Sequence, residues 1–249
     1  MSGHSKWSTI KRAKGVKDAK RGAIFTKLGN LITIAAKDKG ADMDTNFSLR
    51  MAVDKAKTVN MPKDNIERAI KRGTGEFQGE VIEELYYEGI GPASSQVIVK
   101  SLTDNKNRSA STVRHIFSKY GGSLGAVMWN FEQKGVVRIK NEKLILRQGS
   151  GQEIKNLELD SIELDLIEVG VDDIKSEKEG ITVITKVGDL QAVKKYFDNK
   201  EVEIESAEIE YIAKDEIKLE DGDVEKYEKF IEELDDCEDV ADYYSNVKI

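Results

Sequence analysis

The spacing of apolar residues changes once along this chain, at a glycine-rich segment, and that change limits the folds open to it. Before the segment, apolar residues recur every three or four positions, as in amphipathic helices. After it, short alternating runs and helical runs follow one another. The segment itself, GTGEFQGE at 73–80, has the glycines of a joint between domains. A helical unit followed by mixed helix and strand structure is therefore expected.

Three helices are expected before the joint. A first apolar stripe covers 24–39, a second begins near Phe47, and a third covers 61–73. The third begins with Pro62, whose missing N–H costs nothing in the first turn of a helix, and ends at Gly73, a residue suited to a C-terminal cap. These residues predict a compact three-helix unit.

Strands and helices are both expected beyond the joint. The strands are predicted at 84–91, 95–103, 126–131, 135–140, 181–187, 202–213 and 240–244, and the helices at 108–120, 157–169, 190–197 and 224–234. This order lacks the regular strand–helix alternation of a doubly wound fold. We therefore predict the α+β class, with mixed sheets after the helical unit.

Basic residues are concentrated at the N-terminal end. The first 22 residues hold seven Lys or Arg and one acidic residue, although the whole chain has 46 Asp and Glu against 39 Lys and Arg. This segment has too few large apolar side chains to bury a core, so we expect a flexible or weakly helical arm that orders on a polyanion. Nucleic acid is the simplest such partner. The acidic C-terminal half would be repelled by phosphate, so nucleic acid should be bound at the N-terminal end.

The composition points to a globular protein of a reducing compartment. Hydrophobic residues make up 39% and charged residues 34% of the chain. Cys237 is the one cysteine, so an intrachain disulfide is impossible. No run of apolar residues approaches a membrane span, and no apolar signal core follows the basic N-terminus. We expect a cytoplasmic protein without membrane contact.

The sequence does not favour catalysis. Its two histidines are His4 in the arm and His115 on an expected helix, and neither has a Cys or Ser in a recognisable nucleophile pattern. The acidic cluster at 232–239 lacks EF-hand spacing and is interpreted as a solvated helix end. GTGEFQGE lacks the Lys-Ser/Thr ending of a phosphate-binding loop. We therefore expect no catalytic residue, metal site, cofactor or small-molecule substrate.

Several motifs of the first 125 residues resemble the YebC family. They are GHSKW at 3–7, DAKRG at 18–22, IFTKL at 24–28, NMPKDNIERAIKRGTG at 60–75, YEGIGP at 87–92, LTDNKNR at 102–108 and VRHIFSKYGGSLG at 113–125. That family includes proteins labelled probable transcriptional regulators and mitochondrial relatives described as translational activators. The resemblance implies non-enzymatic regulation of gene expression through nucleic acid.

The resemblance also implies three domains, a helical one and two α+β ones, with the third inserted into the second. The basic arm and helical domain are then expected at 1–77. The second domain is expected at 78–133 and, after the insertion, at about 210–249, where the 224–234 helix and 240–244 strand would complete it. The inserted α+β domain is expected at 134–209.

Candidate nucleic-acid contacts are cations that neutralise phosphates and one aromatic ring. Trp7 could stack on a base or anchor the arm to its own domain. The LTDNKNR loop offers two cations at a strand-to-helix junction, and its alternative role is a helix cap made by Asp104 or Asn107 with solvent-facing charges. The full candidate set is Lys6, Trp7, Lys11, Arg12, Lys14, Lys17, Lys20, Arg21, Lys27, Lys63, Lys71, Arg72, Lys106 and Arg108.

The choice between RNA and DNA stays open at the level of sequence. The chain has no zinc-ligand spacing, basic zipper or clear reading helix. A lysine-rich arm joined to small domains suits ribosomal RNA, where shape and phosphates dominate recognition. We therefore favour RNA- or ribosome-associated translational regulation. DNA-binding transcriptional control at a promoter is the alternative, and an adaptor for an acidic protein is a second one. A monomer is expected, since no coiled-coil heptads occur.

Overall fold

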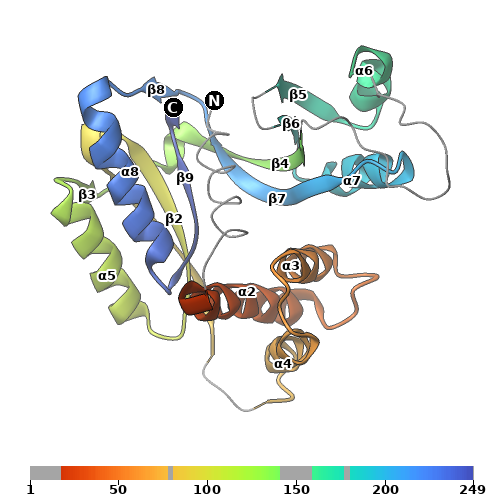
Figure 1. The fold of residues 1–249 in the computed structure, drawn as a ribbon, viewed down its shortest axis with the longest axis horizontal. Helices are drawn as coiled ribbons and strands as arrows, with labels where there is room; N and C mark the ends of the chain where they lie inside the picture. The colour runs from red at the N-terminus through yellow and green to blue at the C-terminus, as the bar shows by residue number, and fades with distance from the viewer. Residues whose placement is uncertain (1–17, 78–80, 141–158, 177–179, 249) are drawn as a thin grey trace. The chain divides into compact units, whose positions relative to one another are not determined.

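The computed structural model of the chain describes residues 18–77, 81–140, 159–176 and 180–248 (Figure 1). The chain divides into two compact units. Of the described residues, one unit comprises 132–140, 159–176 and 180–212, and the other comprises 18–77, 81–131 and 213–248. Each unit has its own helices and sheet.

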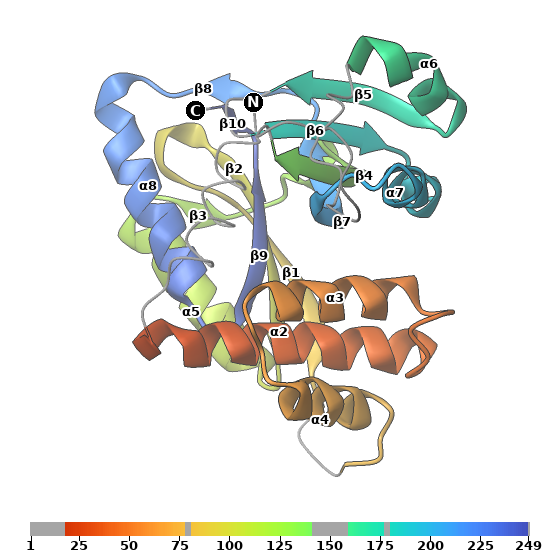
Figure 2. The same cartoon turned by 45° about the vertical axis from the view of Figure 1, so that its right-hand side comes forward.

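The expected three-helix unit is present. Its helices are α2 (Asp18–Lys39), α3 (Phe47–Thr58) and α4 (Lys63–Gly73), which pack together in Figure 2. The core is formed by apolar residues that recur at helical spacing on all three helices. Its buried members are Leu28, Ile32, Ala35, Ala36, Leu49, Val53, Ala56, Met61, Ile66 and Ala69. Helix α2 begins at residue 18 and not at 24, so the end of the expected arm is helical.

A buried asparagine sets the turn between α2 and α3. The Asn46 side chain accepts a hydrogen bond from the backbone N–H of Leu49 at 3.0 Å, which caps α3. Its amide nitrogen donates to the backbone oxygens of Ala35 at 2.7 Å and Gly40 at 2.8 Å. One side chain therefore satisfies both helix ends that meet at this turn.

The larger compact unit, which includes these three helices, also contains a four-stranded antiparallel sheet in the order β3-β1-β2-β9. Its strands are β1 (Glu83–Ile90), β2 (Gln96–Thr103), β3 (Ser123–Leu124) and β9 (Val240–Ser245). A 3₁₀ turn, η1 (Pro92–Ser94), connects β1 to β2. Because β9 pairs with β2, the C-terminal end of the chain completes a sheet begun more than 130 residues earlier.

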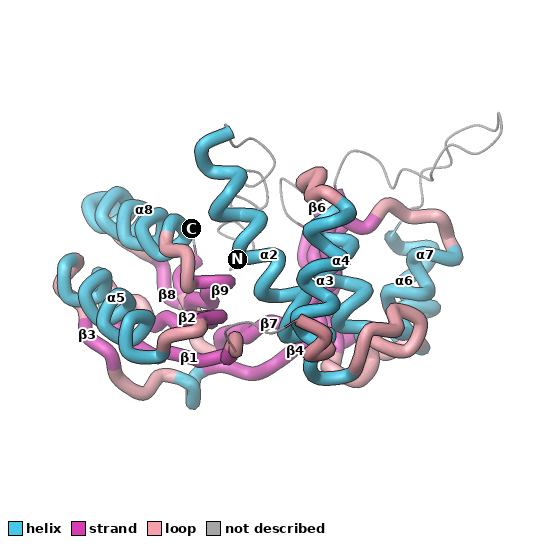
Figure 3. The backbone as a smooth tube through the Cα atoms, turned by 90° about the horizontal axis from the view of Figure 1, so that it is seen from below, coloured by secondary structure: helices cyan, strands magenta, loops and turns pink. Residues whose placement is uncertain are grey.

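Two helices cover one face of this sheet. Helices α5 (Lys106–Lys119) and α8 (Asp221–Asp236) lie side by side along it in Figures 1 and 3. Phe117 of α5 and Phe230 of α8 meet edge to face, with ring centroids 5.0 Å apart. A short parallel pair, β8 (Ile217–Lys218) and β10 (Val247–Lys248), lies outside the sheet.

The strand expected at 126–131 is wrong. The chain instead forms a 3₁₀ turn, η2 (Met128–Asn130), and the next strand begins at Phe131. The Glu88 carboxylate accepts hydrogen bonds from the backbone N–H groups of Val127 and Met128, both at 2.7 Å. A side chain has therefore taken backbone donors that a strand would use for its ladder, a competition that hydrophobic alternation does not reveal.

The 132–212 unit is a second α+β arrangement. Its sheet has the order β5-β6-β4-β7, with β4 (Phe131–Lys140), β5 (Val171–Ser176), β6 (Gly180–Thr185) and β7 (Ile204–Ala213). Its helices are α6 (Leu159–Glu168) and α7 (Leu190–Asn199). Strand β5, whose sequence is VDDIKS, was not expected, because it has few apolar residues. A helical unit followed by α+β structure confirms the expected fold class.

Candidate nucleic-acid interface

Most of the candidate residues in the arm lie outside the described residues. They are Lys6, Trp7, Lys11, Arg12, Lys14 and Lys17. Lys20 and Arg21 fall in the first turn of α2. The contribution of the arm therefore stays a prediction.

The described part of the helical unit carries a group of exposed cations. Lys37 and Lys39 lie in the last turn of α2, and Arg68 and Lys71 lie on α4. None of these four side chains is paired with an acidic residue in the part of the chain that the structure describes. Lys63, also exposed, has Glu67 one turn away at 3.4 Å. We call Lys37, Lys39, Arg68 and Lys71 the open cations.

Many cations of the α+β parts, in contrast, are paired with carboxylates. Examples with N–O distances between 2.7 and 3.1 Å are Lys100 with Glu84, Lys119 with Glu233, Lys134 with Asp172, Lys194 with Asp198, and Lys229 with Glu225. An ion-paired ammonium must give up its carboxylate before it can neutralise a phosphate. Part of the positive charge of the α+β parts is therefore already neutralised, although exposed cations without an acidic partner among the described residues occur there too, at Arg114, Lys186, Lys195, Lys218 and Lys226.

The LTDNKNR loop belongs to the paired group. Lys106 lies 2.7 Å from a carboxylate oxygen of Glu83. Arg108 lies 2.7 Å from Asp104 and 2.8 Å from Asp239. The hydrogen bonds to Asp239 and then Asp104 raise the pKa of Arg108 above its ordinary value. Both candidate cations of this loop are thus held by carboxylates of their own domain.

The cap of α5 is Asn105, which is neither of the two residues suggested for that role. Its side-chain oxygen accepts the backbone N–H of Arg108 at 3.0 Å, the usual N-cap geometry. Asn105 also receives support from Thr103, whose hydroxyl oxygen accepts the Asn105 backbone N–H at 3.1 Å. The Asn105 side chain of this loop therefore caps the N-terminus of α5.

Lys27 also has an internal partner. Its half-buried ammonium donates to the backbone oxygen of Asp235, near the end of α8. Desolvation lowers the pKa of Lys27, and the nearby negative charge of Asp235 partly opposes that shift. A cation at the C-terminal end of a helix meets the negative end of the helix dipole. This contact ties α2 to α8.

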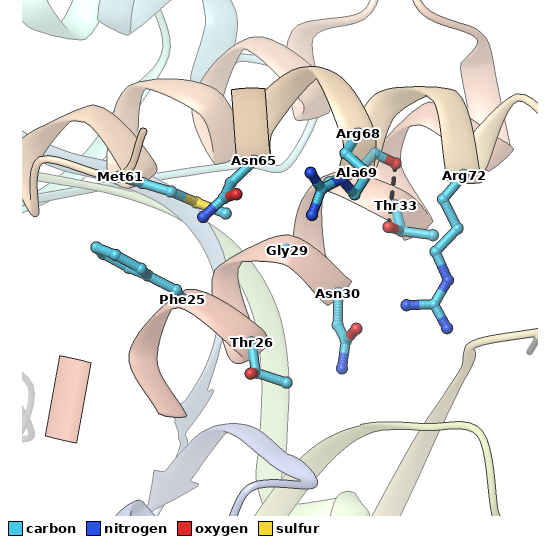
Figure 4. Close-up of a pocket in the computed structure, with 10 residues that line it drawn as sticks. All are labelled: Phe25, Thr26, Gly29, Asn30, Thr33, Met61, Asn65, Arg68, Ala69 and Arg72. Atoms are coloured by element: carbon cyan, nitrogen blue, oxygen red, sulfur yellow. Dashed lines mark hydrogen bonds between the residues drawn. The ribbon is translucent and has the colours of Figure 1, made fainter. Parts of the chain in front are cut away.

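A pocket of about 320 Å³ opens between α2 and α4, and we call it the α2–α4 pocket. Figure 4 shows Phe25 and Met61 at one end, Arg72 at the other, and Arg68 between them on α4. Its ten lining residues are Phe25, Thr26, Gly29, Asn30, Thr33, Met61, Asn65, Arg68, Ala69 and Arg72, and none of them is acidic. Of the candidate contacts that lie among the described residues, Arg72 alone lines it.

Sequence reasoning did not identify this pocket. The available signal was a pair of asparagines, Asn30 and Asn65, at the edges of the apolar stripes of α2 and α4. Helical periodicity assigns such residues to the edge of a stripe, and it does not reveal that two helices bring them to one hollow.

The structure also bears on the expected absences. Within the described ranges, no helix combines the length and apolar character needed to cross a bilayer. Among the same residues, no group of three His, Cys, Asp or Glu side chains is arranged to hold a metal ion. His115 lies exposed on α5.

Comparison with known proteins adds two family matches and close relatives. The model described as the TACO1/YebC protein N-terminal domain matches residues 5–76, and the model described as the TACO1/YebC second and third domain matches 82–247. A probable transcriptional regulatory protein of Desulforapulum autotrophicum is 45% identical, with 100% of this chain and 97% of the relative covered. A protein of the same description from Thermotoga petrophila is 44% identical, with 100% and 94% covered.

A solved structure has the same fold. The crystal structure of a conserved hypothetical protein from Aquifex aeolicus superimposes with a TM-score of 0.79 at 35% sequence identity. The superposition covers 93% of this chain and 92% of that one. Two family models that together span most of the chain, and relatives above 40% identity over its full length, establish that this protein belongs to the TACO1/YebC family.

Proposed function

We propose that this protein is a non-enzymatic regulator of gene expression that binds nucleic acid through its N-terminal arm and helical unit. The observation that carries the proposal is the contrast between the open cations of the helical unit and the many paired cations of the α+β parts. Exposed cations without a carboxylate partner can take up phosphates at little cost. The seven basic residues of the first 22 add positive charge to the same end of the chain.

RNA, in ribosome-associated translational regulation, is the proposed target. Contacts from lysines and arginines that follow phosphates give affinity without base choice, which suits a folded RNA. The proposed protein acts in the cytoplasm as a monomer, with the ribosome or its RNA as partner. The acidic α+β parts face away from the RNA or touch basic proteins.

DNA-binding transcriptional control is the second candidate. The names of the relatives favour it, because they describe probable transcriptional regulatory proteins. A regulator of that kind would retain a particular promoter sequence and reject others of equal length.

The decisive experiment compares two sets of charge changes. The arm variant carries Lys→Gln or Arg→Gln at Lys11, Arg12, Lys14, Lys20 and Arg21. The control variant carries Lys→Gln at Lys100, Lys119, Lys134, Lys194 and Lys229, all paired cations, so that both variants change the net charge equally. Each protein is followed through sucrose gradients of cell lysate at low and moderate salt, with and without nuclease.

Salt-sensitive and nuclease-sensitive migration with ribosomes, lost in the arm variant and kept in the control variant, is the expected result. If the protein stays at the top of the gradient and is retained on one promoter fragment, its function would be transcriptional regulation through DNA. Two results would contradict binding of nucleic acid through the arm. One is co-migration with ribosomes that survives nuclease, and the other is an equal loss of co-migration in both variants.

A further inference from the structure

The α2–α4 pocket exists because two helices touch at one end and leave space at the other. The Thr33 hydroxyl donates to the backbone oxygen of Ala69 at 3.1 Å. A Cβ added at Gly73 would lie 2.4 Å from the backbone oxygen of Thr33, so the helices are in direct backbone contact there. At Gly29, one turn earlier on α2, an added Cβ would meet only the methyl group of Met61, at 3.9 Å. The missing side chain of Gly29 therefore leaves the hollow open.

The polar groups of the pocket have the properties of a binding site. Asn30 and Asn65 are half-buried, and neither side chain hydrogen-bonds to another described residue. A helix seam that served packing alone would be filled by apolar groups or would pair such amides. Each amide offers two N–H donors and a carbonyl acceptor, a set that matches the edge of a nucleobase.

Stacking and charge complete this chemistry. Phe25 contributes an aromatic ring to one wall, and aromatic rings are the usual platforms for unstacked bases. Arg68 and Arg72 bring guanidinium groups to the same pocket, with the open cation Lys71 exposed beside them on α4. Guanidinium groups bind phosphate oxygens through paired hydrogen bonds.

We propose that the α2–α4 pocket binds one unstacked nucleobase of a single-stranded RNA segment, while the Arg68 guanidinium binds an adjoining phosphate. This inference rests on the proposed function and gives the helical unit a base-binding role in addition to phosphate contact. The volume of about 320 Å³ lies at the lower end of the roughly 300–1,000 Å³ of small-molecule sites, a size that fits a single base and excludes a duplex.

The test uses the full chain and a fluorescent single-stranded RNA of mixed sequence. A second oligonucleotide has the same length and charge but abasic sugars at its central positions, and a third is the DNA of the same sequence. Gly29→Leu fills the pocket without changing charge. Gly222→Leu is the matched control, because Gly222 lies on α8 outside the pocket and an added Cβ there meets nothing within 4 Å. Dissociation constants come from fluorescence anisotropy at fixed salt.

The wild type and Gly222→Leu should bind the intact RNA about tenfold more tightly than the abasic RNA, a typical effect of one stacked base. Gly29→Leu should lose this advantage and bind both RNAs alike. Arg68→Gln should weaken both. Equal binding of intact and abasic RNA by the wild type would overturn the pocket assignment and leave the proposed function intact. No binding of any oligonucleotide would instead contradict the proposed function.

Two further comparisons make the result specific. If Gly29→Leu melts at a lower temperature than the wild type, the Asn30→Ala/Asn65→Ala variant replaces it, and the same loss of base dependence is expected. A base effect that survives in that variant would also overturn the assignment. An equal base effect with the DNA oligonucleotide would contradict the choice of RNA.

Discussion

Gly73 shows how one missing side chain sets the distance between two helices. It is the last residue of α4, and its position was expected from its role as a helix end. The structure adds a second reason for glycine. A Cβ there would lie 2.4 Å from the Thr33 backbone oxygen and 2.7 Å from the Ala36 Cβ. The first is a backbone atom of α2 and the second is a Cβ fixed to that backbone, so no side-chain rotation can move either of them away.

Gly73→Ala should therefore destabilise the protein by about 2 kcal/mol, the usual scale of overpacking between elements. Gly29→Ala, on α2, should be neutral or stabilise by up to about 1 kcal/mol, because alanine favours a helix and the site has space. Urea unfolding of both variants measures the difference. Similar free energies of unfolding for the two variants would show that α2 and α4 can move apart without loss of stability.

Lys27 and Lys71 illustrate why two lysines of one basic region are not equivalent. Lys27 is half-buried and bound to the Asp235 backbone oxygen, whereas Lys71 is an open cation. Under the proposed function, Lys71→Gln should weaken RNA binding several-fold, and Lys27→Gln should change it little. Anisotropy titrations at one salt concentration test this. A larger loss for Lys27→Gln would indicate that the contact with α8 opens when RNA binds.

At the scale of elements, strands β4 and β7 are joined by a buried ion pair. Arg138 of β4 and Glu210 of β7 are 2% and 4% exposed, and the two groups form a bidentate pair whose second bond is 2.9 Å long. Each charge is tolerable there because the other neutralises it. A sequence cannot reveal this pairing, since the two residues lie 72 positions apart on different strands.

Glu210→Leu should therefore cost about 3–5 kcal/mol, because it removes the Glu210 carboxylate from beside the buried Arg138 charge. The double variant Arg138→Met/Glu210→Leu should recover most of that loss. Denaturant unfolding followed by circular dichroism measures all three proteins. A double variant no more stable than Glu210→Leu alone would show that the pair supplies more than charge neutralisation.

Helices α5 and α8 are linked at the surface by Glu233. Its carboxylate accepts from the Lys119 ammonium at 2.7 Å and from the Tyr120 hydroxyl at 2.8 Å. The hydrogen bond from Lys119 is the main cause that holds the pKa of Glu233 below its ordinary value of 4.5. The carboxylate thus stabilises the fold above pH 4.5, and this contribution is lost as the pH falls through the lower pKa of the folded state.

In Glu233→Gln, the free energy of unfolding should accordingly fall less than in the wild type as the pH drops below 4.5. The difference between the two proteins should be less than about 1 kcal/mol, because the pair lies near the surface. Glu228→Gln, at an exposed position of the same helix, is the control and should follow the wild type. Thermal melting from pH 6 to pH 3 records the profiles. Identical profiles for Glu233→Gln and the wild type would exclude a stabilising role for this link.

At the scale of the whole molecule, charge is separated along the chain. The net charge is −7, yet residues 1–73 hold 17 Lys or Arg against seven acidic residues. An acidic body attached to a basic end repels a polyanion everywhere except at that end. Binding should then be oriented, and it should depend strongly on salt.

A plot of log affinity against log salt should be steep for the wild type and flatter for the five-residue arm variant. Each lost phosphate contact on single-stranded nucleic acid lowers the slope by about 0.7, so the full loss of five contacts lowers it by about 3.5. The control variant with neutralised paired lysines should retain the wild-type slope. An unchanged slope in the arm variant would mean that the arm does not contact phosphates.

The limits of prediction from sequence follow from the range of each interaction. The helical unit and its three helices could be predicted, because helix periodicity and capping are local properties. The 3₁₀ turn at 128–130 could not, because Glu88, 39 residues before Val127, takes its backbone donors. Strand β5 could not, because its sequence has few apolar residues and only its pairing with β6 marks it as a strand. The expected domain limits near 77, 133 and 209 stay predictions, as do the site residues of the arm.

By itself, the sequence determined the class of the fold, the family and the position of the positive charge, since all three depend on composition and on short motifs. Only the tertiary structure decided which cations are available. Lys106, Arg108 and Lys27 have partners that come from other segments, and Asn30 and Asn65 meet at one pocket only when α2 packs on α4. Charge belongs to a residue, but its availability depends on neighbours that folding brings from far along the chain.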